Sequence, residues 1–353
     1  MNVSWDKLIQ GLRQKDVRAM ARLITRIENR EDGWKTAMTN IYPLAGAARV
    51  FGITGSPGAG KSTLTCEIAG NLVDRGFTVG IIAVDPSSPF SGGALLGDRL
   101  RMQSLFNMPE VYIRSMATRG MLGGLCQAAR DVIRIMDAFG KDVILIETVG
   151  VGQDEIEIVR TADQVMVVLV PGQGDGIQAI KAGVMEIADL YIINKADRPG
   201  ADAVVADVQA MLSLSSQTAN DLPPVLPVSA LKQNGIKELV AVLLEKTADK
   251  RKQTVKNEIR IKEEILSLLE REVFRQVRNR CERDGSLAHA VNRMMQQKGD
   301  PYTIVRQMLM DFDLRKNPTP EEKENDRNHC GNDPATGRIY RSDRQHHHTA
   351  GKL

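Results

Sequence analysis

The sequence predicts an α/β domain with a mostly parallel sheet between two layers of helices. Short apolar runs alternate with helix-length segments across residues 49–247, and most of these runs end at Gly, Asp, Pro or Asn. Because the runs are apolar on both faces, helices are expected to cover both sides of the sheet. A glycine-rich loop directly follows the first run. The runs are residues 50–54, 79–84, 143–146, 165–170, 190–193 and 225–228.

Residues 1–48 predict an N-terminal helical extension. Their apolar residues recur at helical spacing among charged residues, which indicates two amphipathic helices. The apolar positions are Leu8, Ile9, Leu12, Val17, Met20, Ala21, Leu23, Ile24 and Ile27.

Residues 248–313 predict a C-terminal helical extension. A charged linker, residues 246–256, leads into a long amphipathic helix with apolar positions from Ile259 to Val277, and a second helix is expected from His289 to Met310. Such an extension is either an oligomer interface or packs on its own core. Residues 314–353 are almost free of aliphatic side chains, so this tail is expected to be disordered.

Composition and charge favour a soluble, cytoplasmic protein. Lys and Arg (47) nearly balance Asp and Glu (44), and this balance indicates neither a nucleic acid nor a membrane as partner. Cys66, Cys126, Cys281 and Cys330 lie far apart without C-x-x-C spacing, which favours a reducing compartment over a zinc site or a disulfide framework. No segment reads as a signal peptide or a membrane span.

The glycine-rich loop has the form of a Walker A motif. An apolar-periodic helix with Leu64, Ile68 and Leu72 follows it, so the loop lies between a strand and a helix as the motif requires. Glycines let successive backbone N–H groups point at phosphates, Lys61 would neutralise the β and γ oxygens, and Ser62 would place its hydroxyl on Mg²⁺. The predicted nucleotide-binding residues are Gly55, Ser56, Pro57, Gly58, Ala59, Gly60, Lys61, Ser62 and Thr63.

A polar segment after the run 190–193 predicts that the base is guanine. Asn194, Lys195 and Asp197 come directly after this strand, at the edge where such sheets bind ligands. Asp197 can accept from both N–H groups on guanine's Watson–Crick edge, whereas adenine would leave the carboxylate unpaired. Alone, the pattern is also that of a helix N-cap. The loop after the last run is expected to read guanine O6 and consists of Ser229, Ala230 and Leu231.

Acidic residues between these motifs are candidate Mg²⁺ ligands together with Ser62. Asp85, Asp98 and Glu147 lie at or after strand ends, and Mg²⁺ prefers oxygen ligands. Each could instead be a cap or turn carboxylate. Gly150 would let a backbone N–H approach the γ-phosphate.

Taken together, the motifs resemble the MeaB/ArgK family of GTPases, which includes the methylmalonic aciduria type A protein. The resemblance covers residues 10–245, with a looser match to residue 313. It rests on the Walker A loop 55–63 and on V-D-P-S-S-P (84–89), G-D (97–98), E-T-V-G-V-G-Q (147–153), P-G-Q-G-D (171–175) and N-K-A-D (194–197).

The resemblance implies a P-loop G-domain of the signal-recognition and nickel-chaperone GTPase class that forms homodimers through its helical extensions. It implies GTP and GDP as exchanging ligands with Mg²⁺, and no permanently bound cofactor. It also implies a partner, an adenosylcobalamin-dependent acyl-CoA mutase such as methylmalonyl-CoA mutase, whose cofactor loading and protection the GTPase would gate.

Residue roles carried over from the family concern the switches. Ser62, Asp85, Asp98 and Glu147 would surround the Mg²⁺, with Glu147 in switch II. Residues 172–181 are similar to switch III, which relays nucleotide state to the mutase. Asp175, Gln178 and Lys181 match its polar positions, while Gly176 replaces a common acidic residue. The expected catalytic residues are Lys61, Asp85, Glu147 and Lys181.

Two other functions fit parts of the sequence. A nickel-inserting GTPase would need a Cys- and His-rich site, and the histidines of the tail, such as His346, lack the spacing of a closed one. A P-loop kinase or transport-linked ATPase would use ATP, which Asp197 disfavours. Lys181 also fits an ordinary surface lysine, and the role of Gln153 as a water-positioning residue stays open.

Overall fold

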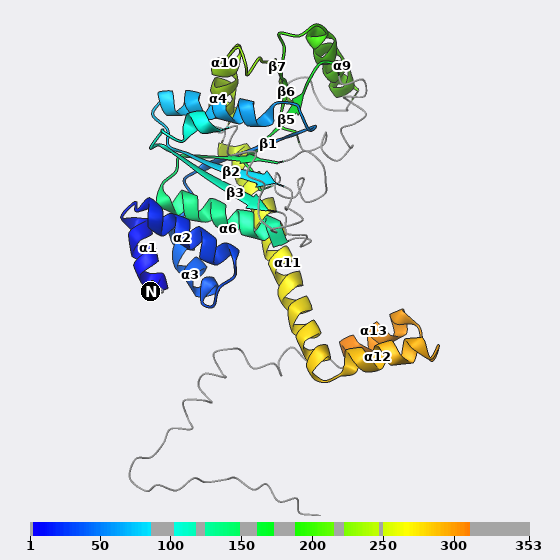
Figure 1. Cartoon of the computed structure of the whole chain (residues 1–353). Coiled ribbons are helices and arrows are strands. Elements are labelled where there is room, and N and C mark those ends of the chain that lie inside the picture. The colour runs from blue at the N-terminus through cyan, green and yellow to red at the C-terminus, as the bar shows by residue number, and fades with distance from the viewer. Residues whose placement is uncertain are drawn as a thin grey trace, which may run out of the picture. The chain divides into compact units, whose positions relative to one another are not determined.

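Within the described residues, seven parallel strands form the sheet of the first part of the chain (Figure 1). Their order is β3-β2-β4-β1-β5-β6-β7. They are β1 (Arg49–Gly55), β2 (Val79–Asp85), β3 (Val111–Ala117), β4 (Val143–Glu147), β5 (Gln164–Leu169), β6 (Leu190–Ile193) and β7 (Val225–Pro227). Because β1 lies between β4 and β5, the loop after it opens at the middle of the sheet edge.

The computed structural model describes residues 3–85, 102–117, 124–148, 161–172, 188–214, 222–246 and 250–310. The chain divides into the units Met1–Ile261 and Lys262–Leu353. The first unit contains the whole sheet, and the predicted fold class is confirmed.

All six predicted apolar runs are strands, and a seventh strand, β3, was not predicted. It is the edge strand next to β2, and Arg114 and Ser115 interrupt its apolar character. Arg114 forms an ion pair with Glu28 of the second helix, which explains how a charged residue is kept in an edge strand. An edge strand needs apolar residues less than a central one, so its sequence signal is weaker.

Helices cover both faces of the sheet, and the side chains of β1 alternate between them. Val50 packs with the N-terminal helices and α6 (Gly124–Phe139), together with Ile82 and Ile144. Phe51 and Ile53 pack on the other face with α4 (Lys61–Asp74) and α10 (Ile236–Lys246). A smaller cluster joins β5 and β6 to α9 (Ala201–Ser213). Short 3-10 helices span Tyr42–Leu44 and Gln103–Leu105.

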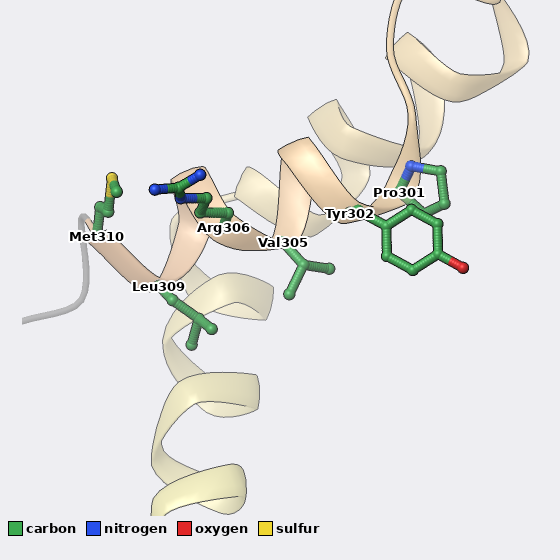
Figure 2. A pocket seen from close by; sticks show the side chains of 6 residues that line it. All are labelled: Pro301, Tyr302, Val305, Arg306, Leu309 and Met310. Atoms are coloured by element: carbon green, nitrogen blue, oxygen red, sulfur yellow. The ribbon is translucent and has the colours of Figure 1, made fainter.

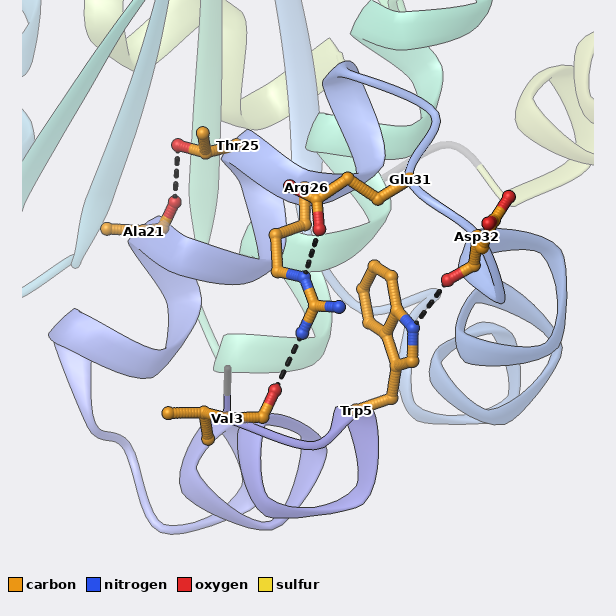
Figure 3. A network of polar contacts seen from close by, with 7 residues as sticks. All are labelled: Val3, Trp5, Ala21, Thr25, Arg26, Glu31 and Asp32. Atoms are coloured by element: carbon orange, nitrogen blue, oxygen red, sulfur yellow. Dashed lines mark hydrogen bonds and ion pairs between the residues drawn. The ribbon is translucent and has the colours of Figure 1, made fainter. Parts of the chain in front are cut away.

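The N-terminal extension contains three helices where two were predicted. They are α1 (Trp5–Arg13), α2 (Val17–Glu28) and α3 (Trp34–Ile41). Figure 3 shows how Arg26 of α2 fastens them. Its guanidinium lies 3.9 Å from the centroid of the Trp5 ring, donates to the carbonyl of Val3 at 2.7 Å, and pairs with Glu31 at 2.7 Å. The Trp5 indole donates to the carbonyl of Asp32 at 2.8 Å, which joins α1 to the turn before α3.

The C-terminal helices differ from the prediction at two places. Helix α11 (Lys250–Arg283) begins inside the segment expected to be a linker, because Lys, Arg and Gln favour helix even without an apolar stripe. The expected second helix is divided into α12 (Ser286–Met295) and α13 (Pro301–Met310). Proline cannot continue a helix but is well placed to begin one, so Pro301 sets the division.

Helix α13, in the unit Lys262–Leu353, presents apolar side chains to solvent. Tyr302 is 86% exposed and Met310 is 71% exposed. Figure 2 shows the pocket along this helix, which is lined by Pro301, Tyr302, Val305, Arg306, Leu309 and Met310. Clustered exposed apolar groups of this kind mark interaction surfaces. None of the helices in the described ranges is long and apolar enough to cross a membrane.

Candidate functional site

The glycine-rich loop joins the end of β1 to the start of α4, and its glycines are required by its geometry. Gly60 has a φ of +85° and Gly58 one of +77°, values that residues with a side chain rarely adopt. At Gly55 a Cβ atom would lie 2.3 Å from the carbonyl oxygen of Val168, so only glycine allows β1 to approach β5 there. The loop therefore leads the chain directly into the N-terminus of α4, which favours anions.

Lys61 is the first residue of α4, and its side chain folds back over the loop. Its Nζ donates to the carbonyl oxygens of Gly55 at 2.7 Å and Ser56 at 3.1 Å, and the residue is buried. The ammonium group is thus held inside the loop that the sequence assigns to the phosphates. Pro57 lies in the exposed turn of the loop and Thr63 in the first turn of α4.

Ser62 and Glu147 come together although they are far apart in sequence. The Ser62 hydroxyl donates to Oε1 of Glu147 at 2.6 Å, and both residues are buried. Glu147 ends β4, next to β1 in the sheet, which explains the meeting. The pair fits the expected Mg²⁺, because both groups offer the hard oxygen atoms that this ion prefers. Among the described residues, no cluster of three or more His, Cys, Asp or Glu side chains suits a metal ion.

Cys66 lies on α4, close enough to Glu147 to feel its charge. Burial, with a smaller contribution from the carboxylate, raises the pKa of the Cys66 thiol to about 12. The thiol therefore stays protonated at neutral pH, as is typical of a small buried core residue.

Several predicted site residues lie outside the described parts of the chain. Asp85 is the last residue of β2, but its side chain is not among the described ones. Asp98, Gly150 and Lys181 fall in ranges that the structure does not describe, as does all of the segment 172–181 except Gly172.

Asn194 ties the guanine segment to the phosphate loop. Its Nδ2 donates to the carbonyl oxygen of Ala59 at 2.8 Å, and its Oδ1 accepts from the backbone N–H groups of Lys195 and Ala230 at 2.8 and 3.2 Å. Asn194 as a residue is 2% exposed. Lys195 has a φ of +58°, and its Nζ donates to the carbonyl oxygen of Gly58 at 2.7 Å. The two motifs, about 135 residues apart, therefore form one site.

Asp197 is oriented by the loop that follows β7. The Ser229 hydroxyl donates to Oδ1 of Asp197 at 2.6 Å, and Nζ of Lys232 lies 3.6 Å from Oδ2. The hydrogen bond from Ser229, with a smaller contribution from Lys232, lowers the pKa of the Asp197 carboxyl. The group is thus kept ionised, the form that accepts two hydrogen bonds from guanine.

The loop from Ser229 to Asn234 is closed by a pair of backbone hydrogen bonds. Ser229 N–H donates to Asn234 O at 3.0 Å, and Asn234 N–H donates to Ser229 O at 3.1 Å. Leu231 projects from its tip and is 85% exposed. The ion pair of Lys232 with Asp197 and the hydrogen bond of Gln233 to Glu67 were not predicted, since neither Lys232 nor Gln233 belongs to a motif. Their position close to Ser229 in the sequence was the available signal that they lie near the site.

Comparisons with known proteins identify a family of GTPases. The family described as Methylmalonyl Co-A mutase-associated GTPase MeaB matches residues 20–285. A relative from Pyrococcus abyssi, named a GTPase, is 46% identical over 316 residues, which cover 87% of this chain and 96% of the relative. A protein of Geobacillus kaustophilus named fused isobutyryl-CoA mutase is 38% identical over 219 residues, or 59% of this chain and 20% of that protein.

One solved structure has the same fold over nearly its whole length. It is named LAO/AO transport system kinase, has a TM-score of 0.65 and 28% sequence identity, and the match covers 88% of this chain and 99% of that one.

Proposed function

The chain belongs to the MeaB family of methylmalonyl-CoA mutase-associated GTPases, and from this membership we propose that it uses GTP hydrolysis to gate adenosylcobalamin loading and protection on an acyl-CoA mutase. The GTPase activity follows from the fold and from relatives that are named GTPases. The mutase as partner is supported most directly by the relative in which a homologous segment is fused to isobutyryl-CoA mutase.

The nucleotide would lie across the two joined loops. Its phosphates would face the backbone N–H groups at the start of α4, with Lys61 neutralising the β and γ oxygens after releasing the carbonyls of Gly55 and Ser56. Its base would lie against Asn194 and Asp197. The Asp197 carboxylate, ionised and oriented by Ser229, would accept from the two N–H groups of guanine.

Ser62 and Glu147 would hold Mg²⁺ at the phosphate loop, and we propose Asp85 and Asp98 as further ligands of the ion. When bound, the ion neutralises the charge that develops on the phosphates. The hydrogen bond between Ser62 and Glu147 holds the hydroxyl and the carboxylate in place. Because Glu147 itself belongs to the segment expected to be switch II, a change at the phosphates would reach that segment directly.

The relay to the mutase is proposed to run through residues 172–181, with Lys181 as its reporter. Lys181→Ala should leave intrinsic GTP hydrolysis nearly unchanged and remove most of the increase that the mutase causes. Lys237→Ala, which changes an exposed lysine on α10, is the matched control. Full stimulation in the Lys181 variant would remove the relay role and leave the GTPase assignment intact.

The exposed apolar side chains of α11 to α13 support a homodimer. Phe274, Tyr302 and Met310 are each more than 60% exposed within the unit Lys262–Leu353, and a second copy of the chain would bury them. Light scattering should give twice the chain mass, and Tyr302→Glu with Met310→Glu should give the single mass. A single mass for the parental chain would reject the dimer.

The cobalamin role is tested by transfer of the cofactor. Purified mutase without cofactor, the GTPase and adenosylcobalamin are mixed with GDP or with a non-hydrolysable GTP analogue, and binding to the mutase is followed by absorbance. Transfer that depends on the nucleotide is expected. Identical transfer with both nucleotides and without the GTPase would refute the gating role.

A further inference from the structure

The loop Ser229–Asn234 is connected to α4 by a contact that no motif contains. The side-chain amide of Gln233 donates to Oε2 of Glu67 at 2.8 Å. Glu67 lies on the helix that begins with Lys61 and Ser62. The end of the base-reading loop is therefore attached to the same helix that begins at the phosphate loop.

The backbone of Gln233 shows that the loop is held in a constrained shape. Gln233 has a φ of +58°, a left-handed conformation that glycine and asparagine adopt more readily than glutamine. Its N–H donates to the carbonyl oxygen of Ala230 at 3.3 Å. Two residues on, Gly235 has a φ of +77°, and a Cβ there would lie 2.8 Å from the carbonyl oxygen of Pro227. Gln233 thus adopts a backbone conformation that is unfavourable for a residue with a long side chain, and from this position its side chain reaches Glu67 on α4.

The start of the loop has a separate anchor. Ala230 N–H is bonded to Asn194, which also holds the phosphate loop through Ala59. The loop is consequently connected at its first residues, through Asn194, to the phosphate loop, and at its last residues to α4. We expect its position relative to the base to depend on both attachments, because the backbone pair between Ser229 and Asn234 joins the two ends of the loop.

We propose that Gln233 is a positioning residue for the guanine nucleotide: by bonding to Glu67, it fixes the loop Ser229–Asn234 against α4 and slows release of the nucleotide. The inference rests on the proposed placement of the base at Asn194 and Asp197. The side chain of Gln233 bonds to Glu67 and not to the residues expected to hold the base or the phosphates, so its effect is expected on the rate of dissociation.

The experiment measures dissociation of a fluorescent GDP analogue from the full chain by chase with unlabelled GDP. Gln233→Gly removes the side chain and relieves the left-handed strain, so the loop keeps its backbone shape. Dissociation should become about two- to fivefold faster, as expected for loss of one hydrogen bond at the surface. The matched control is Gln297→Gly. It relieves the same left-handed backbone strain at a glutamine with a φ of +53° outside the first unit, and this variant should release GDP at the parental rate.

A reversed pair separates this role from a general loss of stability. Gln233→Glu places two carboxylates together and should also speed release. Adding Glu67→Gln lets the new amide donate to the new carboxylate and should restore the parental rate. Restoration supports the proposal even if the single variants have a lower Tm, and failure to restore overturns it. Parental rates in both single variants would overturn it as well. If the base does not bind here, the Asp197→Asn test described below fails independently.

Discussion

The amide Nδ2 of Asn194 lies 2.8 Å from the carbonyl oxygen of Ala59 and donates a hydrogen bond to it. This bond passes beside Gly60, where a Cβ atom would lie 2.6 Å from the same nitrogen. The guanine segment and the phosphate loop therefore constrain each other, and a change in one should be felt in the other.

Gly60→Ala should weaken GDP binding much more than Gly58→Ala. Both positions have a positive φ, so backbone strain should destabilise both variants by about 1–2 kcal/mol. Only at Gly60 does the new methyl group displace Asn194, since nothing lies within 4 Å of a Cβ at Gly58. Calorimetric titration with GDP should show an additional loss of about tenfold or more for Gly60→Ala. Equal losses would mean that the contact with Asn194 is unimportant for binding.

Asp197→Asn should lower the affinity for GTP by about 10- to 100-fold and raise that for xanthosine triphosphate. The new amide can donate to the extra carbonyl of xanthine, whereas guanine presents a donor there. Asp202→Asn on α9 makes the same chemical change at an exposed carboxylate and serves as the control. Titration of both nucleotides decides the matter, and an unchanged GTP affinity would contradict the guanine assignment.

Ser229→Ala should move the acid limit of GDP binding to higher pH. In the parental chain the hydrogen bond from Ser229 lowers the pKa of Asp197, so the ionised carboxylate, and with it the affinity, is lost only when pH falls through that lowered value. Without the hydroxyl, the pKa rises toward its ordinary value and the loss begins earlier on acidification. GDP affinity measured against pH tests this, with Ser213→Ala as control. Superimposable profiles would show that Ser229 does not control the carboxyl.

Lys61→Ala should reduce GTP turnover by at least about 10²-fold, because it removes the cation proposed to lie against the β- and γ-phosphates. The control is Lys141→Ala, which changes another buried lysine. Lys141 donates a hydrogen bond of 2.7 Å to the carbonyl oxygen of Glu110 and lies away from the phosphate loop, so this variant should keep its turnover per folded molecule. Phosphate release at saturating GTP is the measurement. Parental turnover in Lys61→Ala would mean that the loop is not the catalytic cradle.

Much of the fold was predictable because the sheet is parallel and buried on both faces. Six strands appear as apolar runs, and both nucleotide motifs lie at strand ends that the topology brings to one edge. The edge strand β3 was missed because Arg114 breaks its apolar pattern. The start of α11 was missed because a charged helix and a charged linker have similar compositions.

The long-range contacts of the site could be predicted only where motifs named both partners. Ser62 and Glu147 were each predicted from their motifs, so their meeting was expected. The bond between Gln233 and Glu67 joins residues 166 positions apart that carry no motif, and it depends on how α10 and α4 pack. Such contacts follow from tertiary packing, which periodicity and spacing do not encode.

The central claim, a GTPase coupled to an acyl-CoA mutase, is tested most directly by steady-state GTP turnover with and without a purified adenosylcobalamin-dependent mutase. We expect slow turnover by the GTPase alone, a clear increase when the mutase is added, and turnover at least about 10²-fold lower in both conditions for Lys61→Ala. Turnover that is the same with and without methylmalonyl-CoA mutase and isobutyryl-CoA mutase would contradict it.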